Sequence, residues 1–180
     1  MKQGPTRLAP HSMNPRSQAD LTLRLAGEED ARIIATMSRE LIETGLGWSW
    51  TPSRVLRAIR DPDTLTLVAC DGPMIIGFAI MQFAADRAHL SLLAVRKLRQ
   101  RQGIGRRMVE WLETSARVAG IARVHLELRV NNHSARAFYA DIGFAETAQV
   151  PGYYRGTETA VRMVRVLRTH SELPPFPEIG

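Results

Sequence analysis

The apolar residues of the chain repeat with two different periods, and the changes of period divide the sequence into strands and helices. In 21–26 (LTLRLA) apolar and polar residues alternate, which predicts a strand with one buried face. Two later β-rich runs, 64–71 and 74–83, are joined by Asp-Gly-Pro, which predicts a hairpin. The other predicted strands are 88–95, 122–130, 144–150 and 159–167.

Four segments between these strands carry apolar residues at helical spacing. The first, 27–45, starts with acids, has apolar residues three and four positions apart and ends in glycine. Pro52 opens a short second helix that stops before Asp-Pro-Asp. The strongest amphipathic pattern covers 104–120, and a last helix is predicted over 133–143; both end in glycine, a common residue after a helix.

The order of these elements predicts an α+β fold, because most strands precede the central helix. The 180 residues, of which 44% are hydrophobic, suffice for one domain with a single core, predicted over 21–168. Residues 1–20 are rich in Pro, Ser and Gln without periodicity and predict a flexible leader. Residues 169–180 contain Pro-Pro and predict an irregular tail.

The apolar and cysteine content bounds the cellular setting. The longest apolar stretch, 74–85, is too short to cross a bilayer, and the first residues lack the apolar region of a secretion signal. Cys70 is the only cysteine, so an internal disulfide is excluded, and its apolar neighbours favour a buried, inert thiol. We therefore expect a cytoplasmic protein that does not act at a membrane.

The positive charge is concentrated in one short stretch. The net charge is +6, and Arg96 to Arg107 holds six positive residues with no acid, so this stretch alone equals the whole excess. A general nucleic-acid binder spreads basic residues over a face and interleaves aromatic residues, which are absent here. We therefore expect a local anion as ligand rather than a nucleic acid.

A glycine turn, QRQGIGRR, lies inside this basic stretch, directly before the strongest helix. A helix N-terminus presents unpaired N–H groups and partial positive charge, and glycine lets a ligand approach the backbone. Together they can cradle a pyrophosphate. The turn lacks the Lys-Ser/Thr of a nucleotide triphosphatase, and Met108 replaces the third glycine of a dinucleotide-binding motif. From these residues alone, a structural turn and a phosphate cradle remain equally open.

Two motifs resemble the GNAT superfamily of N-acetyltransferases. The run 95–105 (VRKLRQRQGIG) is similar to the acetyl-CoA signature of that family, with Lys97 where many members have proline. The run 126–144 (LELRVNNHSARAFYADIGF) is similar to its strand, Asn-x-x-Ala, helix, Tyr and Gly-Phe segment. The resemblance covers about 21–167, and it is strongest to the ribosomal-protein alanine N-acetyltransferases.

The resemblance implies a mixed, mostly antiparallel sheet that is flanked by helices and splayed between its fourth and fifth strands, with acetyl-CoA in the split. Carried over by position, Leu93 and Val95 pair with pantetheine through their main chain, and Asn132 bonds the pantetheine arm. Asn132 has an alternative role as a helix cap. The residues that would hold the pyrophosphate, mainly through backbone amides, are Arg101, Gln102, Gly103, Gly105 and Arg106. No metal is expected.

The resemblance also implies three catalytic side chains and one backbone amide that assists them. Tyr139 would stand near the thioester sulfur and protonate the departing thiolate, although it could instead be a core aromatic residue. A backbone N–H of Ala94 or Val95 would polarise the thioester carbonyl. Glu127 is the first candidate for the base, with an ion pair to Arg123 or Arg129 as its structural alternative. His89 is the second, because it falls where the histone-acetylating branch carries its glutamate base.

The acceptor is the least determined feature. The segment 152–167 (GYYRGTETAVRMVRVL) resembles the end of the ribosomal-protein alanine N-acetyltransferases, in which the tyrosine pair borders the substrate groove. This favours the α-amine of a protein or peptide, with acetylation of a small amine such as a polyamine, amino acid or aminoglycoside as the alternative. A third possibility is a module that binds coenzyme A or RNA without catalysis. Trp48 and Trp50 either line the acceptor pocket or pack under the sheet, and monomer and homodimer stay equally open.

Overall fold

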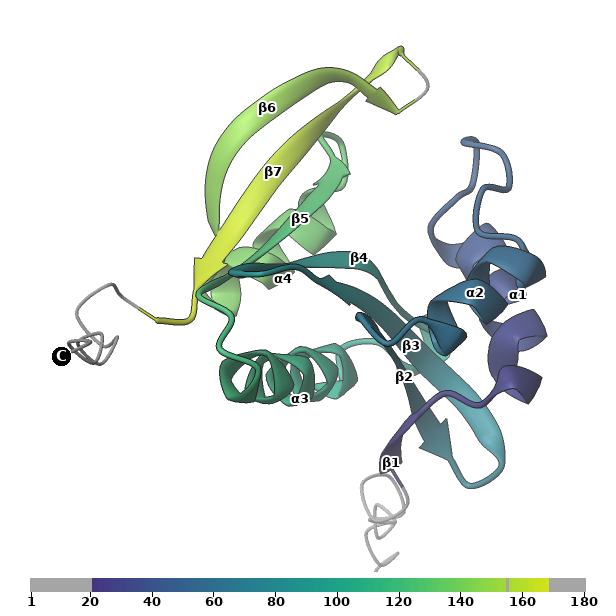
Figure 1. Ribbon diagram of the computed structural model, residues 1–180. Helices are drawn as coiled ribbons and strands as arrows, with labels where there is room; N and C mark the ends of the chain where they lie inside the picture. The colour runs from purple at the N-terminus through teal and green to yellow at the C-terminus, as the bar shows by residue number, and fades with distance from the viewer. Residues whose placement is uncertain (1–20, 155, 169–180) are drawn as a thin grey trace, which may run out of the picture.

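The structure, a computed structural model, describes residues 21–154 and 156–168, which build a seven-stranded sheet with helices on both faces (Figure 1). The strands are β1 (Leu21–Leu25), β2 (Thr64–Asp71), β3 (Met74–Phe83), β4 (Arg87–Val95), β5 (Arg123–Arg129), β6 (Ala145–Tyr154) and β7 (Glu158–Val166), in the spatial order β1-β2-β3-β4-β5-β7-β6. The helices are α1 (Ala31–Leu41), α2 (Pro52–Arg60), α3 (Ile104–Val118) and α4 (His133–Asp141). The predicted leader, 1–20, and tail, 169–180, lie outside the described residues.

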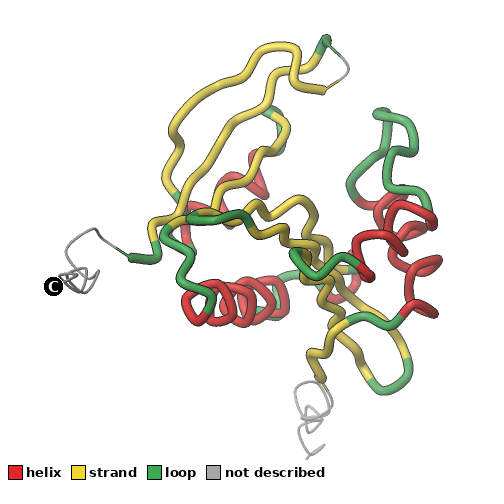
Figure 2. Tube along the Cα trace, viewed as in Figure 1, coloured by secondary structure: helices red, strands yellow, loops and turns green. Residues whose placement is uncertain are grey.

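The sheet is antiparallel at every pair of neighbours except β4 and β5, which run parallel. The predicted hairpin is present, since Asp71 and Met74 pair across the turn between β2 and β3. The parallel pairing covers only Arg87–His89 against Arg123–His125. After these residues the two strands diverge, and the β5–β7–β6 half of the sheet bends away from the β1–β4 half (Figure 2). The predicted α+β class and the splay between the fourth and fifth strands are both confirmed.

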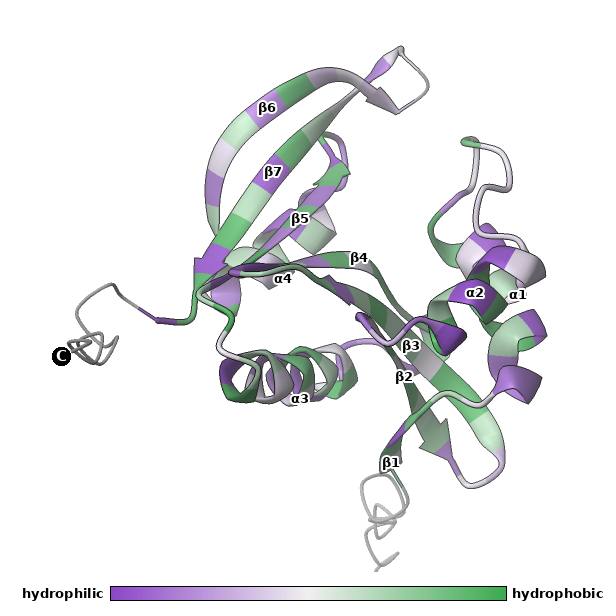
Figure 3. Ribbon diagram, viewed as in Figure 1, coloured by the Kyte–Doolittle hydropathy of each residue, from purple (hydrophilic) through white to green (hydrophobic). Residues whose placement is uncertain are grey.

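Two hydrophobic clusters hold the helices to the sheet, one on each face. The alternation of β2 and β3 sends Val68 and Phe78 toward α1 and α2, and Leu67 and Ala79 toward α3. Figure 3 displays the same alternation in β6 and β7 as bands of hydrophobic and hydrophilic residues. None of the described helices combines the length and the apolar composition needed to cross a membrane.

A β-bulge in β4 changes which face its side chains occupy. Met81 pairs with Leu90 and Ile80 pairs with Leu92, so Ser91 is an extra residue opposite no partner on β3. Leu90 therefore packs into the α3 cluster, whereas Leu92 packs into the α1–α2 cluster. The bulge lies just beyond the last β4–β5 pair and so at the mouth of the split.

Two element boundaries differ from the sequence-based prediction. The first helix begins at Ala31 rather than near 28, because the Asp30 carboxylate accepts from the Gly27 amide at 2.8 Å and closes a separate 3-10 turn before it. Strand β6 runs on to Tyr154, four residues beyond the predicted end at 150. Pro151 is tolerated there because β6 is an edge strand and its pairing with β7 is irregular between Val150 and Tyr154.

Candidate active site

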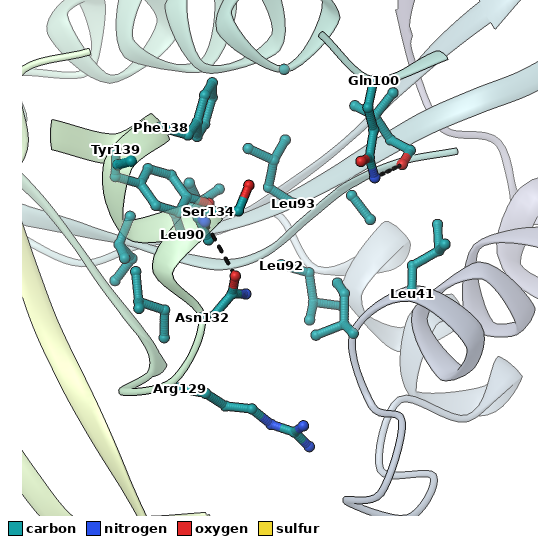
Figure 4. Close-up of a pocket in the computed structure, with 18 of the residues that line it drawn as sticks. Leu41, Leu90, Leu92, Leu93, Gln100, Arg129, Asn132, Ser134, Phe138 and Tyr139 are labelled. Atoms are coloured by element: carbon teal, nitrogen blue, oxygen red, sulfur yellow. Dashed lines mark hydrogen bonds between the residues drawn. The ribbon is translucent and has the colours of Figure 1, made fainter. Parts of the chain in front are cut away.

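A cleft of about 1190 Å³ opens where β4 and β5 separate (Figure 4). One wall consists of β4 and the turn before α3, and the other of β5 and α4. The segment between α1 and α2 and the end of the β6–β7 hairpin border the same cleft. The cleft therefore joins the two motifs that the sequence singles out.

The glycine turn has the backbone conformation of an anion-binding loop. Gly103 is the N-cap residue of α3, with φ of 77°, and Arg101 also has a positive φ of 63°. The amide of Arg107 donates to the carbonyl of Gly103 at 3.1 Å, so the amides of 104–106 have no partner within the helix. No side chain caps this end of α3. These N–H groups remain available for an anion at the cleft wall.

The residues of the turn differ in the contacts that they make. A Cβ atom at Gly105 would lie 3.3 Å from the Phe138 ring, so this glycine permits close packing of α3 against α4, a reason that the sequence alone does not reveal. The Arg106 guanidinium pairs with Asp141 of α4, which leaves the backbone amide as its contribution to an anion site. Gln102 directs its side-chain amide to the carbonyl of Leu98 at 3.4 Å. The predicted roles of Gly105, Arg106 and Gln102 in pyrophosphate binding stay predictions.

The free edge of β4 faces the cleft. The Arg96 amide donates to the Ile76 carbonyl at 2.8 Å, and this bond fixes the alternation of the ladder. Ala94 therefore turns its backbone groups to β3, whereas Leu93 and Val95 turn theirs to the cleft, where the Val95 carbonyl accepts from Gln100 at 2.9 Å. Of the two predicted carbonyl-polarising amides, only that of Val95 is therefore directed suitably.

Asn132 is placed at the start of α4 and lines the cleft. Its Oδ1 atom accepts from the Ala135 amide at 3.1 Å, so the alternative role as a helix cap is real (Figure 4). The same side chain keeps its Nδ2 hydrogens for a ligand. Capping and ligand binding are thus compatible, and only the amide nitrogen can serve the second role.

Tyr139 lies in the cleft between aromatic neighbours. Its side chain is buried, and its ring meets Phe138 and Phe144 edge-on at 5.0 and 5.4 Å between centroids. Burial, with a smaller effect of Tyr154, raises the pKa of Tyr139 well above its ordinary value. The phenol therefore keeps its proton at neutral pH, as a general acid must.

The two candidate bases, Glu127 and His89, contact each other. His89 Nε2 lies 2.8 Å from Glu127 Oε2, and Arg162 Nε donates to Oε1, also at 2.8 Å. The pairing to Arg123 or Arg129 considered from sequence is not found, because register places Arg162 of β7 directly opposite Glu127. Burial opposes ionisation of Glu127, but the hydrogen bonds from His89 and Arg162 outweigh it and lower its pKa to about 2.

The tyrosine pair of β6 reaches across β7 to Glu127 of β5. The Tyr153 hydroxyl donates to Glu127 Oε2 at 3.3 Å, and the Tyr154 hydroxyl donates to the Glu127 main-chain carbonyl at 3.4 Å. Burial raises the pKa of Tyr154 to about 12, so this hydroxyl also stays protonated. The segment that resembles a substrate-groove border therefore meets the candidate base directly.

A second histidine extends this polar group. His125 stacks on His89 with 4.7 Å between centroids and 20° between ring planes, and its pKa is lowered by burial and by His89. Ligand atoms of His89, His125 and Glu127 lie within 4.8 Å of one another. Near-parallel rings direct their lone pairs side by side rather than to one point, and Arg162 already holds the other oxygen of Glu127. This arrangement suits hydrogen bonding better than metal coordination.

The acceptor side of the cleft is lined by residues other than the two tryptophans considered from the sequence. Trp48 and Trp50 do not line the cleft: Trp50 is buried in the α1–α2 cluster, and Trp48 bonds the Ala35 carbonyl at 3.3 Å. From the α1–α2 segment the cleft is instead lined by Leu41, Ile42, Thr44 and Leu46. Ser91, Arg129 and Glu158 also border it. The tertiary arrangement that brings these segments together, which the sequence does not supply, is needed to identify them.

Most of the chain matches one known protein family. The acetyltransferase (GNAT) family profile matches residues 31–144, which is more than half of the sequence and contains both motifs. The chain belongs to the GNAT acetyltransferase family. The splayed sheet and the glycine turn at the start of α3 are thus the GNAT arrangement predicted from sequence.

Individual GNAT relatives are similar over part or most of the chain. The [ribosomal protein bS18]-alanine N-acetyltransferase of Escherichia coli K12 is 40% identical over 81 residues, 45% of this chain and 55% of that protein. The chain thus spans about half the length of that curated relative. The crystal structure of the Escherichia coli ribosomal-protein-S18-alanine N-acetyltransferase superimposes with a TM-score of 0.74 and 26% identity, covering 87% of this chain and 99% of that one. An N-acetyltransferase from Thermoplasma acidophilum in complex with coenzyme A shares the fold, with a TM-score of 0.68, 19% identity and coverage of 79% and 97%.

Proposed function

We propose that the protein transfers the acetyl group of acetyl-CoA to a primary amine, and that this amine is the N-terminal α-amine of a peptide or protein. One observation carries the proposal: a single cleft runs from the glycine turn of α3, past Tyr139, to Glu127 and the tyrosine pair of β6. The similarity to alanine N-acetyltransferases supports this choice of acceptor.

In this proposal the β4–α3 side of the cleft holds acetyl-CoA. The amides of 101–106 bind the pyrophosphate, and Gly103 supplies the turn that exposes them. The main-chain groups of Leu93 and the carbonyl of Val95 pair with pantetheine, and Asn132 donates from Nδ2. Arginines 96, 99 and 107 steer the anion by their charge rather than by direct contact.

The reaction is one acyl transfer. The neutral amine nitrogen attacks the thioester carbonyl carbon, a C–N bond forms, and the C–S bond breaks. The Val95 amide polarises the carbonyl, and Tyr139 gives its proton to the thiolate. The proton of the amine leaves toward Glu127 and His89.

Glu127 and His89 act as a pair in this scheme rather than as alternatives. A carboxylate with a pKa of about 2 is too weak to hold an amine proton, but it can attract the ammonium group and orient the His89 ring through their 2.8 Å contact. The demand on the base is modest for an α-amine, because about a quarter is neutral at pH 7.4, compared with about 0.1% of a lysine amine. An N-terminal acceptor therefore suits this site better than lysine.

The setting and the partners of the protein complete the proposal. The single cysteine, Cys70, is buried on β2, which supports a reducing, cytoplasmic setting. Nucleic acid is not an expected partner, no metal is required by the chemistry, and 21–168 is treated as one catalytic domain. Monomer and homodimer are both compatible with the cleft, which one chain lines by itself.

The test is turnover of acetyl-CoA, followed as free thiol, with a panel of acceptors. Peptides with a free N-terminus should react faster than the same peptides blocked at that end and faster than spermidine or an aminoglycoside. Mass spectrometry of fragments should locate the acetyl group on the α-nitrogen. Much faster turnover of a small amine than of any peptide would replace the N-terminal acceptor by the small-molecule alternative.

A further inference from the structure

Arg129 lies in the acceptor half of the cleft without a part in the scheme above. It follows Glu127 by two residues on β5, so both side chains project from the same face, about 6.6 Å apart along the strand. Figure 4 shows the Arg129 side chain extending into the opening, toward the side of α1 and Leu41. An acceptor that places its amine at Glu127 and extends along β5 would pass this guanidinium.

The contacts of Arg129 join two borders of the cleft. Its Nη2 donates to the Thr44 carbonyl at 2.9 Å, between segments 85 residues apart in sequence. Its Nε atom lies 3.4 Å from Glu158 Oε2, an ion-pair distance without the geometry of a hydrogen bond. This Nε atom is buried and has no hydrogen-bond partner among the described residues. Buried donors are nearly always paired in native proteins, so this Nε–H group lacks a partner that an acceptor atom of a ligand could supply.

The chemistry of the missing acceptor follows from these neighbours. Guanidinium only donates, so the ligand atom must be an acceptor oxygen. Glu158 already balances the charge of Arg129, which favours a neutral carbonyl over a second carboxylate. In a peptide, the first carbonyl follows the α-amine by two bonds. A polyamine has an amine at the same place but no carbonyl.

We propose that Arg129 is a specificity-determining residue that binds the first peptide carbonyl of the acceptor. Through this contact the protein discriminates between peptide N-termini and amines that have no such carbonyl. The inference rests on the proposed N-terminal acetyltransferase function and adds the group that recognises its substrate class. On binding, the acceptor carbonyl satisfies the Nε–H group, which has no hydrogen-bond partner among the described residues.

The experiment compares two acceptors in the full-length protein. One is a short peptide with a free N-terminus, and the other is the same peptide with its first amide replaced by an (E)-alkene, which removes the carbonyl and keeps the shape. Arg129→Ala should lower kcat/KM for the peptide at least tenfold, mainly through KM, and change that for the alkene analogue less than twofold. The ratio of variant to wild type cancels the different pKa values of the two amines. The dissociation constants of wild type and Arg129→Ala for acetyl-CoA should agree within twofold.

Controls separate recognition from a structural role of the bridge to Thr44. A loosened α1–α2 segment would slow both acceptors equally, and this result, like an unchanged rate for both, would overturn the inference. Arg129→Lys keeps the charge without the Nε donor and should give the same result as Arg129→Ala. It therefore provides the test if the alanine variant does not fold. Arg136→Ala, which removes a surface arginine paired with Glu146, is the matched control and should leave both rates unchanged. If wild type acetylates no peptide at all, the proposed function fails independently of Arg129.

Discussion

The substitution Glu127→Gln tests the electrostatics of the cleft through protein stability. The Glu127 side chain is 5% exposed and receives hydrogen bonds from His89 and Arg162, which lower its pKa from 4.5 to about 2. The difference is about 2.5 pKa units, and at 1.36 kcal/mol for each unit it corresponds to about 3 kcal/mol of folding free energy. Glutamine has no charge to be stabilised and so loses this contribution.

The sign of the pH dependence follows from a folded pKa below the unfolded one. The stabilisation is fully present above pH 4.5 and disappears as the pH falls toward 2. The variant should therefore be about 3 kcal/mol less stable than wild type at pH 7, with a difference that shrinks from pH 4.5 downward. Urea unfolding at pH 7, 5, 4 and 3 measures it for both proteins.

Glu28→Gln is the matched control, because Glu28 is an exposed carboxylate paired with Arg60. It should change stability little at any pH. A destabilisation of Glu127→Gln that stays constant from pH 7 to pH 3 would show that the amide loses packing rather than charge, and the electrostatic reasoning would be refuted. In activity assays the same variant should lose most at low pH, where neutral amine is scarce and the missing carboxylate matters most.

Three further substitutions test the cofactor side of the cleft. Gly103→Val should raise the dissociation constant for acetyl-CoA at least tenfold, or about 1.4 kcal/mol, by calorimetry; Gly120→Val, at the other end of α3 with a φ of 80°, carries similar strain and should not. Tyr139→Phe should lower kcat about 100-fold at unchanged acetyl-CoA affinity, and a loss below twofold would assign the proton to water. Asn132→Ala should cost about 1 kcal/mol of stability through the lost cap and also weaken acetyl-CoA binding, whereas unchanged affinity would leave only the cap.

The elements of the fold were predictable because their signals are local. The β-rich runs 64–71 and 74–83 and the Asp-Gly-Pro between them specify a hairpin, and the glycine turn marks the start of α3. The bulge at Ser91 was not predictable, since one extra residue leaves the apolar pattern of β4 almost unchanged and becomes visible only against β3.

The site was predictable as a set of residues but not as a network. Glu127 and His89 are 38 residues apart, and their hydrogen bond depends on the short parallel pairing of β4 and β5. Arg162 and Tyr153 reach Glu127 from β7 and β6, so their roles require the register of three strands. The pKa of Glu127 depends on these partners and therefore could not be inferred from the sequence.

The three-residue contact between β4 and β5 has a consequence for how the molecule assembles. Each half of the sheet is continuous in sequence, 21–95 and 123–166, and its hairpins close over short distances, so each half can form early. Their main-chain seam is brief, and side chains packed beneath α3 and α4 must hold the halves together. The two halves supply opposite walls of the cleft. A ligand between them therefore binds only the form in which the halves are in contact, and it stabilises this form by mass action. Acetyl-CoA would then stabilise the contact between the two halves of the sheet as well as serve as a substrate. The backbone amides of 87–89 and 123–125 should therefore exchange hydrogen more slowly when acetyl-CoA is bound than when it is absent.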